Sequence, residues 1–73
     1  MMHRFVIHTQ TQQNGEHEVH NLTAGCQYLP PELHRLDLGM HPDCHSALAE
    51  ARRNWPPRRI NGCPYCAWEC HAA

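Results

Sequence analysis

The sequence has few of the side chains that build a hydrophobic core. Val, Ile, Leu and Phe together number 11 of the 73 residues, and Phe occurs once. A chain of this size buries only about 60% of the surface that it exposes when unfolded. At that size, apolar burial and the conformational entropy of ordering the chain nearly cancel. The sequence therefore predicts one small domain, residues 1–73, that needs a further source of stability.

Other absences exclude whole classes of protein. No apolar run is long enough for a membrane span, and none of signal-peptide length follows Met1. We therefore expect a cytoplasmic protein with no membrane partner. Lysine is absent, and six arginines against seven acids give a net charge of −1. That balance excludes a protein that binds nucleic acid through bulk positive charge.

Metal-binding side chains are abundant in the same sequence. It contains 5 cysteines and 8 histidines. The odd number of cysteines disfavours a complete disulfide framework, and cysteines that cluster in a reducing compartment bind metal more often than they pair. A mixed set of sulfur and nitrogen ligands favours Zn²⁺ over iron. The composition therefore predicts a zinc ion as the missing source of stability.

Local patterns predict a small α+β fold. Residues 3–10 and 16–22 are expected to form a β-hairpin around an Asn-Gly turn. A short third strand is expected at 36–38, and a helix at 43–54 with Asp43 as its N-cap. We therefore expect a three-stranded antiparallel sheet packed on one helix, with a zinc knuckle that joins the C-terminus to the hairpin.

The spacing of Cys63 and Cys66 is typical of a zinc knuckle, because two intervening residues let both sulfurs face one ion. The alternative is a redox pair, which would require a thioredoxin-like unit with a parallel sheet and a longer chain. A closed structural site needs four ligands. Cys26, in the loop after the hairpin, is the predicted third ligand, although a free cysteine is often a buried apolar residue. The fourth ligand is less defined, and the candidates are His20, which we favour, and Cys70, His71 and Cys44.

The order of these ligands resembles the Ada-type metal-binding module. That family is named for the N-terminal domain of the bacterial methylphosphotriester repair protein, and a related version is found as a tail on some bacterial nucleases. The similarity covers roughly residues 18–66. It is carried by Cys26, by Leu36-Asp37-Leu38-Gly39, by the Ala-rich segment 46–51 and by Gly62-Cys63-Pro64-Tyr65-Cys66. The resemblance implies zinc held by Cys26, Cys63 and Cys66, with His20 at the first-ligand position.

Several residues outside this site have both a functional and a structural interpretation. Cys44, Cys70 and His71 are candidates for a second metal site with His41 or His45. Alternatively, Cys44 packs in the core, or it forms a disulfide with Cys70 on oxidation.

A basic cluster near the end of the predicted helix also has two interpretations. It consists of Arg52, Arg53, Arg58 and Arg59 around Trp55. The cluster would either contact nucleic-acid phosphates while Trp55 stacks on a base, or be a solvated helix end with Trp55 packed inward. The second interpretation fits the net negative remainder of the chain better. Tyr65 and Trp68 are expected to shield the ion from water.

These patterns favour a structural zinc site without catalysis. Four protein ligands leave no open position for water, so we expect a binding module for a protein or nucleic-acid partner rather than an enzyme. The first alternative, implied by the resemblance, is a zinc-activated thiolate that accepts an alkyl group, or a DNA-binding module. The second alternative is zinc-dependent hydrolysis, for which Glu18 and Glu69 are the nearest candidate bases.

Overall fold

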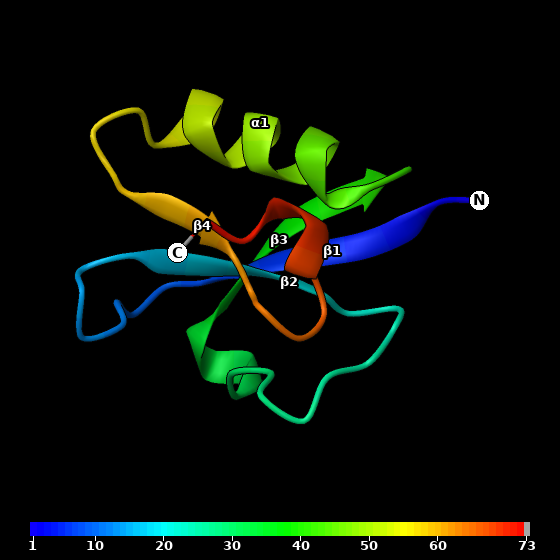
Figure 1. Ribbon diagram of the computed structural model, residues 1–73, viewed down its shortest axis with the longest axis horizontal. Helices are drawn as coiled ribbons and strands as arrows, with labels where there is room; N and C mark the ends of the chain where they lie inside the picture. The colour runs from blue at the N-terminus through cyan, green and yellow to red at the C-terminus, as the bar shows by residue number, and fades with distance from the viewer. Residues whose placement is uncertain (73) are drawn as a thin grey trace.

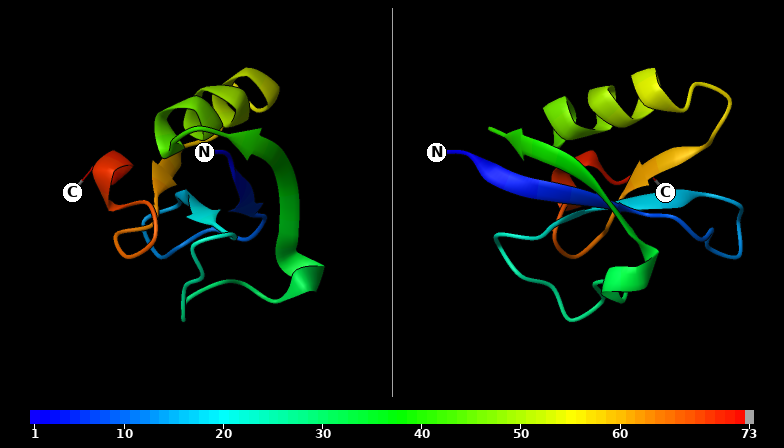
Figure 2. Two further views of the ribbon diagram at one scale, coloured as in Figure 1. Left: turned by 90° about the vertical axis from the view of Figure 1, so that its right-hand side faces the viewer. Right: turned by 180° about the vertical axis from the view of Figure 1, so that it is seen from behind.

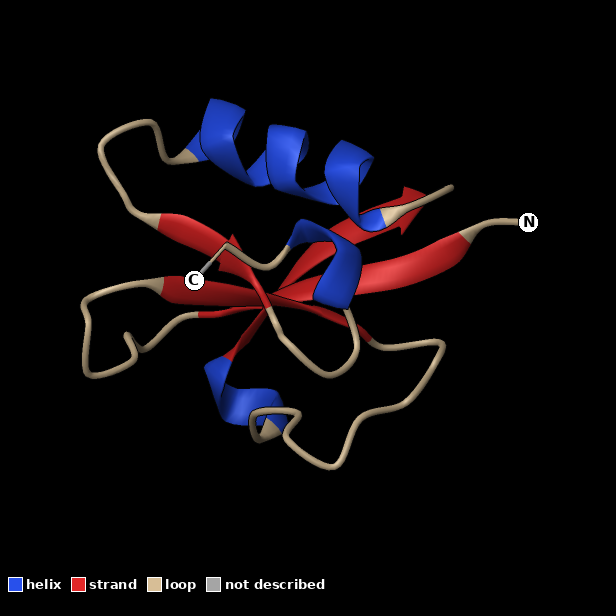
Figure 3. Cartoon of the chain, in the orientation of Figure 1, coloured by secondary structure: helices blue, strands red, loops and turns tan. Residues whose placement is uncertain are grey.

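A four-stranded mixed sheet forms the centre of the computed structural model, which describes residues 1–72 (Figure 1). Its strands lie in the order β3-β1-β2-β4. One α-helix and two short 3₁₀ turns are the other elements of the described residues (Figure 3). The elements are β1 (His3–His8), β2 (His17–Asn21), η1 (Glu32–His34), β3 (Arg35–His41), α1 (Cys44–Asn54), β4 (Ile60–Gly62) and η2 (Trp68–Cys70). The expected α+β class is confirmed.

The hairpin of β1 and β2 has a longer connection than a two-residue Asn-Gly turn. The strands pair antiparallel, with Val6 opposite His20, and β1 ends at His8. In the connection, the Gly15 amide donates to the Gln12 carbonyl oxygen at 2.9 Å, and Gly15 has a φ of +83°. This left-handed backbone suits glycine, which has no Cβ to clash.

The expectation of three antiparallel strands was wrong in its detail. A fourth strand, β4, pairs with β2 in parallel, with Ile60 opposite His17 and Gly62 opposite Val19. The third strand is also longer than expected, because β3 pairs with β1 along its whole length, from His3↔His41 to His8↔Arg35. The sheet therefore joins both ends of the chain, which places the segment after β4 beside β2.

Helix α1 begins as the sequence predicts. The Asp43 carboxylate caps it by accepting a hydrogen bond from the Ser46 amide at 2.9 Å. Four residues on one face of the helix are buried: Cys44, Ala47, Leu48 and Ala51. They pack on Phe5, Ile7 and Val19 of the sheet, and this small cluster is the main hydrophobic core.

The two faces of the sheet have different chemistry. Side chains alternate between faces along a strand, so Val19 points to the α1 side and His20 to the opposite side. On that opposite side, the loops after β2 and after β4 come together, and both views of Figure 2 place them away from α1. The side of the sheet that the helix leaves uncovered is therefore closed by loops, two of which carry cysteines.

A disulfide between Cys44 and Cys70 joins the start of α1 to η2. Of the alternatives for Cys44, the structure therefore contains the disulfide rather than a free core thiol. Among the described residues, the chain has no helix of the length and apolarity that a bilayer crossing requires.

Candidate metal centre

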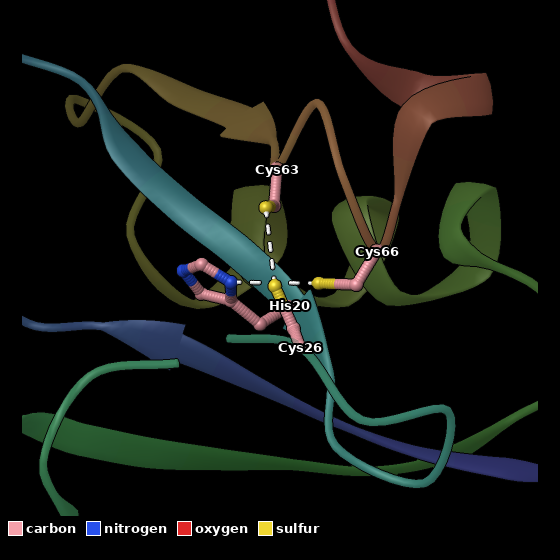
Figure 4. Close-up of side chains that lie close together, drawn as sticks. All are labelled: His20, Cys26, Cys63 and Cys66. Carbon is pink, nitrogen blue, oxygen red and sulfur yellow. Dashed lines mark hydrogen bonds between the residues drawn. The ribbon is translucent and has the colours of Figure 1, made fainter. Parts of the chain in front are cut away.

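Four side chains from three separate segments converge on one point (Figure 4). His20 lies on β2, Cys26 in the loop that follows it, and Cys63 and Cys66 directly after β4. One ligand atom from each of the four residues lies within 4.8 Å of all the others. These are the four residues that the sequence favoured as ligands, so the expected cluster is present in the fold.

Two of the distances between these side-chain atoms match those expected at a tetrahedral zinc site. The sulfurs of Cys26 and Cys63 are 3.9 Å apart, and the Cys66 sulfur is 3.5 Å from His20 Nδ1. With Zn–S bonds of about 2.3 Å and Zn–N bonds of about 2.0–2.1 Å, a tetrahedron separates two sulfurs by about 3.8 Å and a sulfur from a nitrogen by about 3.6 Å. These two distances therefore fit a zinc ion bound between the four side chains.

Backbone amides support the three sulfurs. The amide of Tyr28 donates to Cys26 Sγ, and that of Tyr65 donates to Cys63 Sγ, each at 3.4 Å. In both cases the donor is the second residue after the cysteine. The Asn21 amide donates to Cys66 Sγ at 3.3 Å. Hydrogen bonds to a sulfur favour its thiolate form, which is the form that binds metal.

His20 is prepared to bind through Nδ1. Its side chain is almost fully buried, and burial lowers its pKa to about 4, with the nearby His8 and Arg35 contributing. The ring is therefore neutral near pH 7, as a metal ligand must be. Nε2 is buried without a hydrogen-bond partner among the described residues, but it lies 3.5 Å from a Glu18 carboxylate oxygen. A carboxylate in this position commonly orients a zinc-bound histidine.

Burial favours the metal-binding form of His20 but disfavours the metal-binding form of two of the cysteines. It raises the pKa of Cys63 and of Cys66, because an isolated thiolate is poorly stabilised away from water. A cation bound between these sulfurs would offset the effect of burial and favour the thiolates. With three thiolates, one neutral imidazole and Zn²⁺, the formal charge of the filled site would be −1.

Two tyrosines cover the cysteine loops. The rings of Tyr28 and Tyr65 stack with centroids 4.3 Å apart, so the residues that donate to Cys26 and Cys63 also contact each other. A cavity of about 330 Å³ lies beside this stack and is bordered by Cys63, Glu18 and His8. Trp68, the other residue expected to shield the ion, lies on η2 with 68% of its surface exposed.

The alternative fourth ligands lie outside this cluster. Cys44 and Cys70 are joined to each other. His71 Nδ1 donates to the Gly62 carbonyl oxygen at 2.9 Å, which keeps the residue beside β4. His41, considered for a second site, bonds Ser46 Oγ and the Leu38 carbonyl oxygen through its two ring nitrogens.

The basic cluster at the end of α1 is only partly free. Arg53 pairs with Glu50, and Arg59 bonds the Asn14 carbonyl oxygen and lies near Glu16. Trp55 packs against the hydrophobic core. This geometry resembles the solvated helix end more closely than a surface prepared for base stacking.

The sequence predicted a shielding role for Tyr65, but not the backbone amides that donate to the sulfurs and not the contact with Tyr28. Tyr28 and Tyr65 each lie two positions after a cysteine, and this shared spacing was the sequence feature that could have indicated their role. Glu18 was considered as a catalytic base, but its carboxylate lies on the far nitrogen of His20 and so suits the role of an orienting partner.

Comparison of the chain with models of protein families, with curated proteins and with solved structures found no match.

Proposed function

We propose that this chain is a zinc-binding module in which His20, Cys26, Cys63 and Cys66 hold one structural zinc ion. The observation that carries the proposal is the convergence of one nitrogen and three sulfur atoms within 4.8 Å of each other. Such a set matches the softness and the tetrahedral geometry that zinc prefers.

A structural role for the ion is supported by the number of protein ligands. Four protein ligands leave no position for a reactive water, and Cys63 is fully buried. The ligands also come from segments far apart in the sequence, since Cys26 and Cys63 are separated by 37 residues. An ion that joins them replaces part of the stabilisation that the small apolar core does not supply. The proposed activity is therefore binding without catalysis.

Native mass spectrometry of the oxidised chain tests this proposal. We expect one zinc per chain in the wild type and in His34→Ala, and none in His20→Ala at the same zinc concentration. His34 is a matched control because its ring stacks on His8, near the site, but is not among the four converging side chains. Cys26→Ser should also lose the ion.

Two results would contradict the proposal. The first is a zinc-free wild-type chain at neutral pH in the presence of excess zinc. The second is equal zinc content in His20→Ala and His34→Ala, together with cadmium NMR spectra that show no coupling to the Cys26, Cys63 and Cys66 side chains.

A further inference from the structure

A second group of metal-binding side chains lies at the start of α1, on other elements than the first. Sulfur atoms of Cys44 and Cys70 and a ring nitrogen of His45 all lie within 4.8 Å of one another. Cys44 is buried, Cys70 is half-buried and His45 is exposed. In the structure the two sulfurs are joined in a disulfide, which leaves them no capacity to bind a metal ion.

The two cysteines are held close together by contacts that do not involve the disulfide. The Cys70 amide donates to the Ala67 carbonyl oxygen at 3.0 Å, and the neighbouring His71 is bonded to Gly62. The Asn61 side chain bonds both the amide and the carbonyl oxygen of Ala72, at 2.9 and 2.8 Å. Cys44 is fixed independently as the first residue of the capped helix. Reduction would therefore leave both sulfurs near each other and near His45.

The position of Cys44 also favours its thiolate. The first residue of a helix lies beside unpaired backbone amides and the positive end of the helix dipole, which stabilise a negative sulfur. A stabilised thiolate is a better leaving group when the disulfide is attacked and a better metal ligand once it is free.

We propose that Cys44, His45 and Cys70 form a second, redox-gated zinc site. A thiol or phosphine reductant supplies two electrons to the disulfide, the S–S bond breaks, and the two sulfurs take up two protons. Zn²⁺ then binds the two sulfurs and His45, and the two protons are released to solvent. Oxidation by a small disulfide removes two electrons from the sulfurs, re-forms the S–S bond and releases Zn²⁺, while the oxidant takes up two protons from solvent and becomes two thiols.

The surroundings suit a neutral site with one position left for solvent. Two thiolates balance the charge of Zn²⁺, and the imidazole adds none. A cavity of about 130 Å³ borders Cys44 and is lined in part by Asp43 and Glu69. It offers room for a water ligand as the fourth group.

The proposed exchange keeps the C-terminal segment attached in both redox states. A covalent bond joins η2 to α1 in the oxidised chain, and a zinc ion would join them in the reduced chain. Disulfides of reducing compartments are typically transient and redox-sensing. The proposed site gives the Cys44–Cys70 pair a function in such a compartment, where we expect this chain.

Zinc counting in two redox states tests the proposal. Native mass spectrometry should give one zinc per chain in the oxidised wild type and two after reduction with a phosphine. In the reduced chain, zinc should protect Cys44 and Cys70 from iodoacetamide, as read by peptide mapping. His45→Ala should return the reduced count to one, whereas His34→Ala should leave it at two.

The double variant Cys44→Ser/Cys70→Ser should hold one zinc in both redox states, which reports separately on the first site. The second site would be overturned, and the first left intact, by two results together. The reduced wild type would hold one zinc, and peptide mapping would show that iodoacetamide alkylates Cys44 and Cys70. A different pattern would overturn only the first site. In that pattern the oxidised chain holds no zinc, the reduced chain holds one, and His45→Ala removes it.

Discussion

At the scale of single residues, Gly62 limits the geometry of the cysteine loop. A Cβ added there would lie 2.8 Å from the Ala67 carbonyl oxygen and 3.0 Å from Cys70 Cβ. Both atoms belong to the segment that follows the loop, so Gly62→Ala should push this segment away from β4. We expect a loss of about 1–3 kcal/mol in the free energy of unfolding, the usual cost of such overpacking, and a weaker affinity for zinc. Denaturant titration and zinc competition with a chromogenic chelator measure both.

Gly39→Ala provides the comparison for this variant. Gly39 has a φ of +84°, but an added Cβ would meet no atom within 4 Å. The variant should lose about 1–2 kcal/mol through backbone strain alone and keep its zinc affinity. Equal zinc affinities for Gly62→Ala and Gly39→Ala would show that the close approach at Gly62 does not position the ligands.

A second residue-scale prediction concerns the ion pair between Arg4 and Asp37, which joins β1 to β3. One Arg4 nitrogen lies 2.9 Å from each Asp37 carboxylate oxygen. Hydrogen bonding to Arg4 holds the pKa of Asp37 below its usual value. The pair therefore stabilises the fold above the usual carboxyl pKa of about 3.9, and this stabilisation is lost as the pH falls through the lowered value. NMR titration should show a higher Asp37 pKa in Arg4→Gln, with a stability change of only about 0.2–1 kcal/mol because both groups are exposed.

At the scale of elements, β4 is short and depends on the side chain of one of its residues. Asn61 is buried, and its amide group bonds Glu16, Gly62 and both backbone groups of Ala72. Asn61→Ala should therefore destabilise the fold by about 1–3 kcal/mol, since it leaves buried polar groups without partners. Hydrogen exchange should increase first in the C-terminal segment. Asn54→Ala, on the exposed end of α1, is the control and should have little effect; similar exchange in the two variants would refute the role of Asn61.

The difference between β4 and α1 explains how much of the fold the sequence could predict. Helix α1 is specified locally, by the Asp43 cap and by alanines at helical spacing. Strand β4 is three residues long, and its pairing with β2 joins segments more than 40 residues apart. No local pattern carries that information. The members of the His20, Cys26, Cys63 and Cys66 cluster were predictable because cysteine and histidine have few roles at such spacing, whereas the Tyr28–Tyr65 stack depends on the tertiary arrangement.

At the scale of the whole molecule, the disulfide and the proposed zinc ion would together compensate for the small hydrophobic core. The Cys44–Cys70 disulfide spans 26 residues, and a link of that length stabilises a fold by about 3–4 kcal/mol. The proposed zinc ion spans the chain from His20 to Cys66 on the other side of the sheet. We therefore expect the chain to keep its circular-dichroism spectrum after reduction alone, to lose thermal stability when a chelator is added to the oxidised form, and to unfold when both treatments are combined.

A reduced and chelated chain that keeps its folded spectrum would contradict this description. The oxidised Cys26→Ser variant should behave like the oxidised wild type in the presence of a chelator. Because protons compete with zinc for thiolates and imidazole, acidification should release the ion and lower the midpoint of thermal unfolding together.

The disulfide and β4 would together affect the lifetime of an ion bound at the proposed zinc site. Cys63 and Cys66 lie in a segment that is fastened at one end by pairing with β2 and at the other by the bond to Cys44. Fraying of the C-terminus cannot open such a segment, so departure of zinc from the oxidised chain would require a larger and slower opening of the molecule. A covalent bond outside the zinc site would thereby set the residence time of the ion. Exchange with isotopically labelled zinc would then proceed faster once Cys44 and Cys70 are replaced by serine.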